Sequence, residues 1–293
     1  MKLSILHRTT FLYGEPARDN VNEVRICPLH TFSQNREFFV LKVIPATRLR
    51  TYYDLFSNLV YQFGISHAHS RLVIEARSLI TTESRVDYEA LPYGVSHAAL
   101  AACDSDEGCH QFLVDSKFVQ RTPEIWREAM DIRGDSTDVF QTCYALMAFI
   151  FERCVYQAGI TDSETDAQHV FIYKSGVCQD FTHLMLAYCR ALGIPARYVS
   201  GYVWDPGHDR GSEVMRGSQA SHAWAEVFIP DHGWIGMDPT NNKVVNDQYV
   251  VISIGRDYED VAPVHGSFYG GGQHRSMSVQ VDVRKAGRDV MTA

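Results

Sequence analysis

The sequence predicts an α+β protein, with a β-rich N-terminal region and a second unit in which helices precede an antiparallel sheet. Three observations support this prediction. Apolar and polar residues alternate in several runs within residues 1–82, as they do in half-buried strands. Apolar residues then recur at helical spacing between residues 122 and 192, and the alternation returns after Pro195. Because helices come first and strands follow, the second unit is α+β.

The N-terminal region is expected to form a small antiparallel sheet or sandwich without catalytic residues of its own. The alternation is clearest at residues 38–44, 58–63 and 71–76. Turn signals divide the strands at Gly14-Glu15-Pro16, Pro28 and Pro45. Residues 83–120 are irregular and polar, which predicts a linker.

Three helices are expected before residue 176. The first begins at Pro123, with Thr122 as its N-cap. The second begins near Ser136 and is a buried scaffold helix, because its apolar residues form one stripe. The members of that stripe are Phe140, Tyr144, Met147, Phe151 and Val155. The third begins at Thr165, where Gln168 completes a capping box.

Cys178 lies where a loop turns into a fourth helix. Gly176 supplies the tight turn before the helix, and Gly193 and Pro195 end it. The apolar residues at helical spacing are Phe181, Met185, Tyr188 and Leu192. A thiol at a helix start is close to the positive end of the helix dipole, which favours the thiolate. The alternative is a small buried cysteine, as we expect for the other six. Asp180 should point away from the thiol and cap the first turn or pair with a basic residue.

Strands are expected again after Pro195. Their ranges are 196–204, 221–229, 234–238, 249–254 and 277–283. A long polar loop opens at residues 206–211, and three consecutive glycines at 270–272 form a turn. The last strand could return to the N-terminal sheet. The expected domains are therefore an N-terminal β domain with its linker, 1–120, and a second domain, 121–293.

His222 and Asp238 supply the base and the orienting carboxylate that a thiol nucleophile needs. His222 shares a strand face with Trp224 and Phe228, and Asp238 shares a face with Trp234 on the next strand. These faces coincide only if even-numbered residues pair across the hairpin. The sequence therefore predicts an even register, for example Phe228 opposite Trp234. An odd register without a bulge would place Asp238 behind the sheet.

Composition excludes several classes of protein. A net charge of −8 and a pI of about 5.9 argue against a nucleic-acid-binding or anionic-membrane surface. No run approaches the ~18 apolar residues of a membrane helix, and the first residues contain no apolar core typical of a signal peptide. Seven cysteines without regular spacing favour a reducing, cytoplasmic compartment.

Other candidate motifs are weaker. His67 and His69 have no further ligand at metal-binding spacing, and residues 103–109 resemble a calcium loop only loosely. The three glycines at 270–272 are not followed by a helix, so they do not form a phosphate-binding loop. Arg256, Asp257 and Tyr258 are most simply surface or packing residues. We therefore expect no cofactor and no metal.

Three phrases of the sequence resemble the bacterial transglutaminase-like superfamily. They are GVCQDFTHLMLAYCRALGIPARYVSGYV, SHAWAEVFIPDHGWIGMDPTNN and GRDYEDVAPVHG, and the resemblance covers about residues 140–285. The front segment, with LHRTTFLYGEPA and DLFSNLVYQF, resembles the N-terminal β domain that is usually fused to this core. One departure is Ser57, where that pattern tends to have glycine. The resemblance implies a papain-like core, a triad of Cys178, His222 and Asp238, and no calcium.

The expected activity is acyl transfer from an amide bond of a protein or peptide substrate through a thioester. The acyl group would pass to an amine or to water, so crosslinking, peptidase and amidase activities all stay open. Trp224 and Trp234 would line the cleft, although both could be core residues. The alternatives outside this class are a catalytically silent binding module and a zinc site that uses Cys178 and His222.

Overall fold

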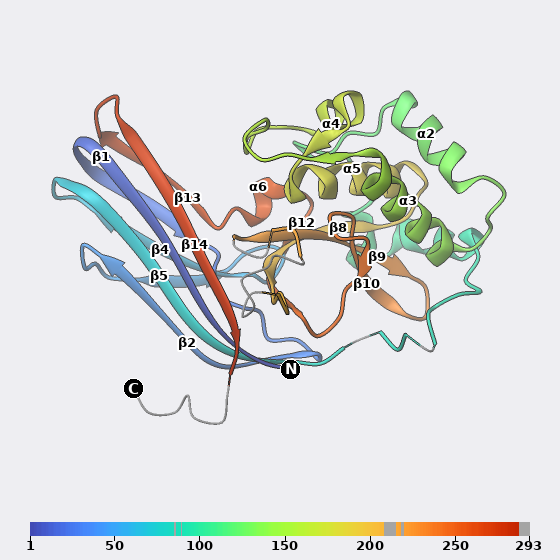
Figure 1. Cartoon of the computed structure of the whole chain (residues 1–293), viewed down its shortest axis with the longest axis horizontal. Helices are drawn as coiled ribbons and strands as arrows, with labels where there is room; N and C mark the ends of the chain where they lie inside the picture. Colours follow the sequence, from blue (N-terminus) through green and yellow to red (C-terminus); the bar gives the residue numbers. More distant parts are fainter. Residues whose placement is uncertain (85, 89, 208–214, 218–219, 287–293) are drawn as a thin grey trace.

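The chain folds into an N-terminal sheet and an α+β unit (Figure 1). The structure is a computed structural model, and it describes residues 1–84, 86–88, 90–207, 215–217 and 220–286. The strands of the N-terminal sheet are β1 (Lys2–Val24), β2 (Gln34–Ile44), β3 (Arg50–Tyr53), β4 (Leu59–Ile65), β5 (His69–Thr82), β13 (Val264–Gly270) and β14 (Arg275–Lys285). They pair in the order β2-β5-β1-β4-β3, and β13 and β14 also pair with β1. The predicted α+β class is confirmed.

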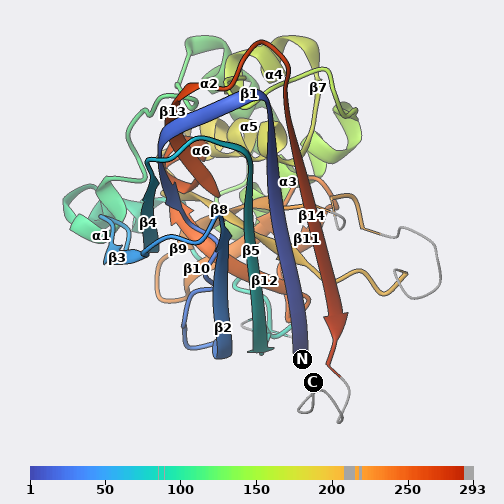
Figure 2. The same ribbon diagram turned by 90° about the vertical axis from the view of Figure 1, so that its left-hand side faces the viewer.

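β1 changes partners along its length. Its first half lies between β5 and β14, and its second half lies between β4 and β13. Figure 2 shows β1 bending between these two halves, so the sheet curls rather than forming two stacked layers. The predicted turn at Gly14-Glu15-Pro16 is wrong, because the strand continues through it with a register shift between Leu12 and Ala17. Gly14 is required by close approach, since a Cβ there would lie 2.8 Å from the carbonyl oxygen of His274.

The C-terminal strand returns to the N-terminal sheet, as predicted. β14 pairs with β1 from Leu3 opposite Lys285 to Tyr13 opposite Arg275. Figure 1 shows β13 and β14 beside β1, although β1 lies at the other end of the sequence. The alternating apolar residues of β14 explain this return, because Val281 and Val283 are buried where the sheet meets the α+β unit.

Seven helices are formed by the described residues. They are η1 (His97–Ser105), α1 (Glu107–His110), α2 (Pro123–Arg133), α3 (Val139–Arg153), α4 (Ala167–Tyr173), α5 (Cys178–Ala191) and α6 (Tyr258–Val261). The predicted cap of α2 is confirmed, because the Thr122 hydroxyl accepts a hydrogen bond from the Ile125 N–H at 3.3 Å. None of the helices formed by the described residues is both long enough and apolar enough to span a membrane.

The buried face of α3 differs from the predicted stripe. Phe140 and Met147 are buried, but Tyr144 is exposed and Val155 lies beyond the helix in an exposed position. The other buried residues of α3 are Val139, Thr142, Cys143, Leu146 and Ile150. Each residue advances about 100° around the helix, and the centre of the buried face lies nearer to Cys143, Leu146 and Ile150, so the predicted stripe runs along one edge of that face.

The start of α4 also differs from the prediction. Asp166, not Thr165, caps the helix, because its carboxylate accepts a hydrogen bond from the His169 N–H at 2.8 Å. The Thr165 hydroxyl instead donates to Asp162 at 3.3 Å. Both residue types cap helices well, and the sequence alone does not decide between neighbours.

The second sheet is antiparallel. Its strands are β8 (Ala196–Val203), β9 (His222–Ile229), β10 (Gly233–Asp238), β11 (Lys243–Val244) and β12 (Tyr249–Gly255), in the order β11-β10-β9-β8-β12. β6 (Val155–Tyr156) and β7 (Ser175–Gly176) form a short parallel pair before α5. The predicted strands are confirmed to within two residues. Of the predicted polar loop, residues 208–211 lie outside the described residues.

α5 packs against one face of this sheet and is buried along most of its length. Odd-numbered residues of β9 and β10, such as Ala225, Val227 and Met237, share the core of α5. Even-numbered Trp224 belongs to a different cluster on the opposite face, together with Tyr249 of β12. The sheet therefore has one face against the helix, and its other face carries Trp224 and Tyr249.

Residues 83–120 were expected to form a linker, but several of their apolar residues pack into the α5 core. These residues are Val86, Leu100, Cys103, Cys109, Leu113 and Val119. Arg190 of α5 is also buried and donates to the carbonyl oxygen of Val114 at 3.3 Å and to the Ser116 hydroxyl at 3.2 Å. The polar composition concealed this packing, because short helical turns place single apolar residues inward without a visible period.

Candidate functional site

Cys178 is the first residue of α5 and is half-buried, whereas the other six cysteines are buried. Asp180 fixes the turn that precedes it, as the predicted helix cap: its Oδ2 accepts hydrogen bonds from the Val177 N–H at 2.7 Å and the Thr161 hydroxyl at 2.6 Å. Gly176 is needed here because a Cβ would lie 2.6 Å from the Asp180 side chain. The cysteine therefore stands at a rigidly capped helix start, where backbone N–H groups point outward.

His222 is the first residue of β9 and is buried. Its Nε2 donates to Oδ2 of Asp238 at 2.8 Å. Among the described residues, its Nδ1 has no well-aligned hydrogen-bond partner, and the Cys178 thiol is close enough to contribute to the pKa of the ring. Gly217 covers this side of the ring, because a Cβ on it would lie 2.7 Å from Nδ1. The imidazole thus has the carboxylate at Nε2, and the Cys178 thiol is among the groups that raise its pKa.

Asp238 is fully buried and accepts five hydrogen bonds from the described residues. Its Oδ2 accepts from His222 Nε2, from Nδ2 of Asn241 at 2.8 Å and from the Tyr249 hydroxyl at 2.8 Å. Its Oδ1 accepts from the backbone N–H groups of Thr240 at 2.9 Å and Asn241 at 3.2 Å. Five donors leave the carboxylate little freedom to rotate, so the imidazole is held in one orientation.

His222 and Asp238 each stabilise the charged form of the other. Burial alone would lower the pKa of His222, but the charge and hydrogen bond of Asp238, with a smaller contribution from Cys178, raise it from 6.5 to about 10. Burial alone would raise the pKa of Asp238, but His222, Asn241 and Tyr249 outweigh burial and lower it. The imidazole is therefore protonated at neutral pH, next to a cysteine at a helix start.

The predicted even register is confirmed. Trp234 lies opposite Phe228, and Gly236 lies opposite Glu226. His222 and Asp238 consequently project from the same face of the β9–β10 hairpin, which permits their hydrogen bond.

The prediction that Trp224 lines the cleft is wrong. Its side chain has no exposed surface, and its ring packs 5.2 Å from the ring of Tyr249 and 6.2 Å from that of His222. Trp234 is at the end of β10 away from Asp238, with the Arg197 guanidinium 4.2 Å above its ring. The alternation of the strand placed both residues on the correct face, but it did not show that other elements cover that face.

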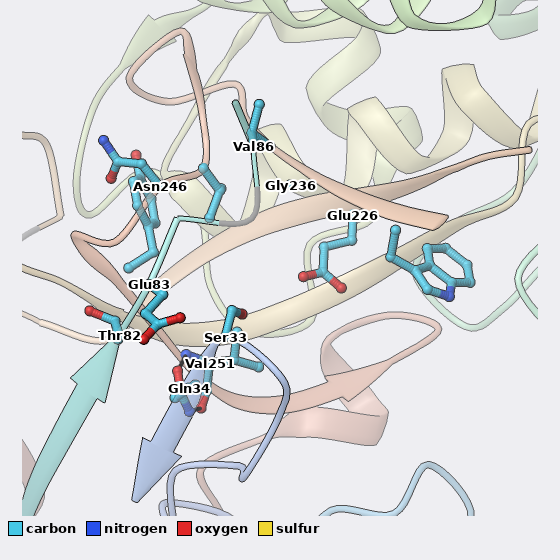
Figure 3. Close-up of a pocket in the computed structure, with 12 residues that line it drawn as sticks. Ser33, Gln34, Thr82, Glu83, Val86, Glu226, Gly236, Asn246 and Val251 are labelled. Carbon is cyan, nitrogen blue, oxygen red and sulfur yellow. Dashed lines mark hydrogen bonds between the residues drawn. The ribbon is translucent and has the colours of Figure 1, made fainter. Parts of the chain in front are cut away.

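Trp234 does line a small cavity between the two parts of the chain (Figure 3). The cavity has a volume of about 40 Å³ and is bordered by Gln34, Thr82, Glu226 and Tyr249. This volume suits one or two water molecules rather than a peptide. The described residues contain no group of three or more His, Cys, Asp or Glu side chains arranged to hold a metal ion.

Asn241 and Tyr249 are site residues that the sequence did not reveal. Asn241 is within the quoted DPTNN phrase, three residues after Asp238, so a turn-forming asparagine beside a buried carboxylate was a usable signal. Tyr249 carried no such signal, because it reaches Asp238 from the far edge of the sheet.

Comparison with known proteins gives two family-model matches and similar proteins in several bacteria. A model of the transglutaminase-like superfamily matches residues 128–239, and a model of the bacterial transglutaminase-like N-terminal region matches residues 3–81. An uncharacterized protein of Mycobacterium tuberculosis is 30% identical over 296 residues, which cover 95% of this chain and 91% of that protein.

Two further matches carry functional names. A protein-glutamine gamma-glutamyltransferase of Pseudomonas aeruginosa is 37% identical over 71 residues, or 24% of this chain and 11% of that protein. A crystal structure from Cytophaga hutchinsonii, described as a "Putative Cysteine Protease", has a TM-score of 0.77 and 25% identity, and the match covers 99% of this chain and 92% of that one.

Proposed function

Because the chain belongs to the transglutaminase-like superfamily, we propose that it is a cysteine enzyme that acts on amide bonds of protein or peptide substrates through a thioester. The proposed catalytic residues are Cys178, His222 and Asp238. The observation that carries the proposal is the buried His222–Asp238 pair at 2.8 Å, whose imidazole interacts with Cys178 at the start of α5.

In the first half-reaction, the sulfur of Cys178 attacks the amide carbonyl carbon and forms a C–S bond. The negative charge that develops on the carbonyl oxygen is stabilised by the backbone N–H of Cys178 at the helix start. His222, protonated and held by Asp238, donates its proton to the amide nitrogen. The C–N bond then breaks, the amine or ammonia leaves, and the thioester remains on Cys178.

In the second half-reaction, His222 is neutral and acts as the base. It removes a proton from an amine or from water as that group attacks the thioester, and the sulfur leaves as a thiolate. An amine acceptor gives a crosslink, and water gives hydrolysis. The Pseudomonas relative that is named a protein-glutamine gamma-glutamyltransferase supports the first outcome, and the Cytophaga structure, which matches 99% of the chain, supports the second.

The alternatives outside this class have less support. A silent binding module does not need five hydrogen bonds around a buried carboxylate that faces a histidine. A zinc ion between Cys178 and His222 would have few ligands, because Nε2 and Oδ2 of the pair already bond to each other.

The test is replacement of the nucleophile, Cys178→Ala. This variant should lose amide turnover, measured with glutamine-containing and ordinary peptides, and should lose alkylation by iodoacetamide at neutral pH. Cys154→Ala, which changes a buried cysteine at the end of α3, is the matched control and should keep both. Turnover that survives in the Cys178 variant would refute the proposal. An added primary amine separates the two outcomes, because only a transferase incorporates it.

We also propose a cytoplasmic location and no nucleic-acid or membrane partner. The support is the acidic net charge of −8 and the seven cysteines, which lie within the described residues and form no disulfide there. Cell fractionation tests the location, and recovery with the envelope or the periplasm would contradict it.

A further inference from the structure

Two buried amide side chains of the N-terminal sheet hydrogen-bond to β12 as a neighbouring strand would. Nε2 of Gln34 donates to the carbonyl oxygen of Val251 at 2.8 Å, and its Oε1 accepts from the N–H of the same residue at 2.8 Å. Asn58 makes the same pair of bonds with Ile254, both at 2.8 Å. β12 is the edge strand of the second sheet, so these amides satisfy backbone groups that β8 cannot reach.

Each amide is itself held firmly. Gln34 and Asn58 are 3% and 1% exposed. Nε2 of Gln34 also donates to the carbonyl oxygen of Leu29 at 2.7 Å, and Nδ2 of Asn58 also donates to Asp54 at 3.1 Å. Both amides therefore use donor and acceptor together, and an apolar replacement would remove the acceptors of the Val251 and Ile254 N–H groups. The carbonyl oxygen of Val251 would keep its hydrogen bond from the Leu29 N–H at 3.1 Å.

β12 carries Tyr249, which reaches the proposed catalytic carboxylate. Tyr249 is two residues before Val251, and its hydroxyl donates to Oδ2 of Asp238 at 2.8 Å. Asp247, which lies two residues before Tyr249, also bonds to the N-terminal sheet, because its carbonyl oxygen accepts a hydrogen bond from the Thr82 hydroxyl at 2.5 Å. Figure 3 shows Gln34, Thr82 and Val251 gathered where β2 and β5 meet this part of the chain.

We propose that Gln34 and Asn58 are positioning residues for catalysis: through β12 they hold Tyr249 in place to donate to Asp238. The N-terminal sheet is then a working part of the active site rather than a separate binding domain. This inference rests on the proposed triad, and it assigns to the N-terminal sheet the task of orienting the triad's carboxylate.

The expected consequence is a change in proton affinity at His222. The titratable groups that face this imidazole in the described residues are Cys178 of α5 and Asp238 of β10, with Tyr249 of β12 behind the carboxylate. Arg216 directly precedes Gly217, the residue that covers Nδ1 of the imidazole. The Tyr249 hydroxyl withdraws charge from the Oδ2 that also binds His222, so loss of this donor leaves the carboxylate more basic and the imidazolium more stable.

The experiment measures the rate of Cys178 alkylation by iodoacetamide against pH in the full-length protein. The high-pH limb of this profile reports loss of the His222 proton. Tyr249→Phe should move that limb upward by roughly half a pH unit. Gln34→Leu and Asn58→Leu should move it in the same direction, and the double variant Gln34→Leu/Tyr249→Phe should move it no further than Tyr249→Phe alone.

Asn20→Leu is the matched control. Asn20 is a buried amide of the same sheet, but its side chain bonds to Tyr13 at 3.0 Å and to Asn22 at 2.7 Å and makes no contact with β12. This variant should lower the melting temperature without moving the high-pH limb. If Gln34→Leu does not fold, Gln34→Glu keeps the size and one acceptor and replaces it in the comparison.

Two results would overturn the inference: an unchanged limb in the Gln34 and Asn58 variants, or a double variant whose shift is the sum of the single shifts. Alkylation needs no substrate, so the inference and the proposed function fail separately. Shifted limbs without any amide turnover would reject the function alone. Normal turnover with unshifted limbs would reject the positioning role alone.

Discussion

Replacement of Asp238 by asparagine removes the charge of the buried carboxylate with almost no change in shape. The backbone N–H groups of Thr240 and Asn241 can still donate to the amide oxygen. The new NH₂ group, however, faces the three groups that donate hydrogen bonds to Oδ2 in the parent protein, which belong to His222, Asn241 and Tyr249. To bond to this NH₂ group, His222 has to become neutral with Nε2 as an acceptor, which puts its proton on Nδ1 and prevents it from acting as a base toward Cys178.

The size of the effect follows from the pKa of His222. In the parent it is raised from 6.5 to about 10 although burial opposes this, so the imidazolium depends on Asp238. A change of that size corresponds to about 5 kcal/mol of preferential stabilisation of the protonated ring. Because the raised proton affinity is lost with the charge, Asp238→Asn should reduce both alkylation of Cys178 at pH 7 and kcat/KM by about a thousandfold.

The assay is the pH profile of alkylation together with steady-state turnover and the melting temperature. Asp257→Asn is the control, because Asp257 is equally buried and accepts from the backbone N–H groups of Phe118 and Glu259, both at 2.9 Å, but it contacts neither His222 nor Asp238. The control should keep the parental profile. A fall of less than tenfold in Asp238→Asn, or an equal fall in the control, would refute the reasoning.

Two further predictions concern stability. Gly201→Ala should destabilise the protein by about 2 kcal/mol, because a Cβ there would collide with the carbonyl oxygen of Val250 and the ring of Trp224. Urea unfolding measures this, and Gly64→Ala, where the nearest atom lies 3.8 Å away, is the control that should change little. Burial lowers the pKa of His7 from 6.5 to about 4, so the unfolded chain binds the extra proton and stability falls as the pH drops from 6.5 to 4. His7→Gln should reduce this loss of stability at low pH by up to about 3 kcal/mol, and a loss as large as in the parent protein would contradict the assignment.

Local patterns predicted the elements that depend on neighbouring residues. The cap at Thr122, the helix that begins at Cys178 and the even register of the β9–β10 hairpin all follow from spacing and residue type within a few positions. Ser57 belongs to the same group. It has a φ of 63°, a left-handed conformation that explains why the resembling pattern tends to have glycine there.

Patterns failed where an element's surroundings decide the outcome. The strand through Gly14-Glu15-Pro16 continues because β13 and β14 support it from a distant part of the chain. Trp224 is buried because the side chains of Tyr249 and the loop residue Met215 pack beside it on its face of the sheet. A period of two tells which face a residue occupies, but it carries no information about what covers that face.

The sequence by itself determined the three proposed catalytic residues, their order along the chain and the strand face that His222 and Asp238 share, because helical and strand periods fix side-chain directions locally. Only the tertiary structure decided that Tyr249 and Asn241 complete the carboxylate's hydrogen bonds and that Gln34 and Asn58 hold the edge strand. The physical reason is that these contacts join segments up to 217 positions apart, and such pairings depend on which strands become neighbours when the apolar faces are buried together.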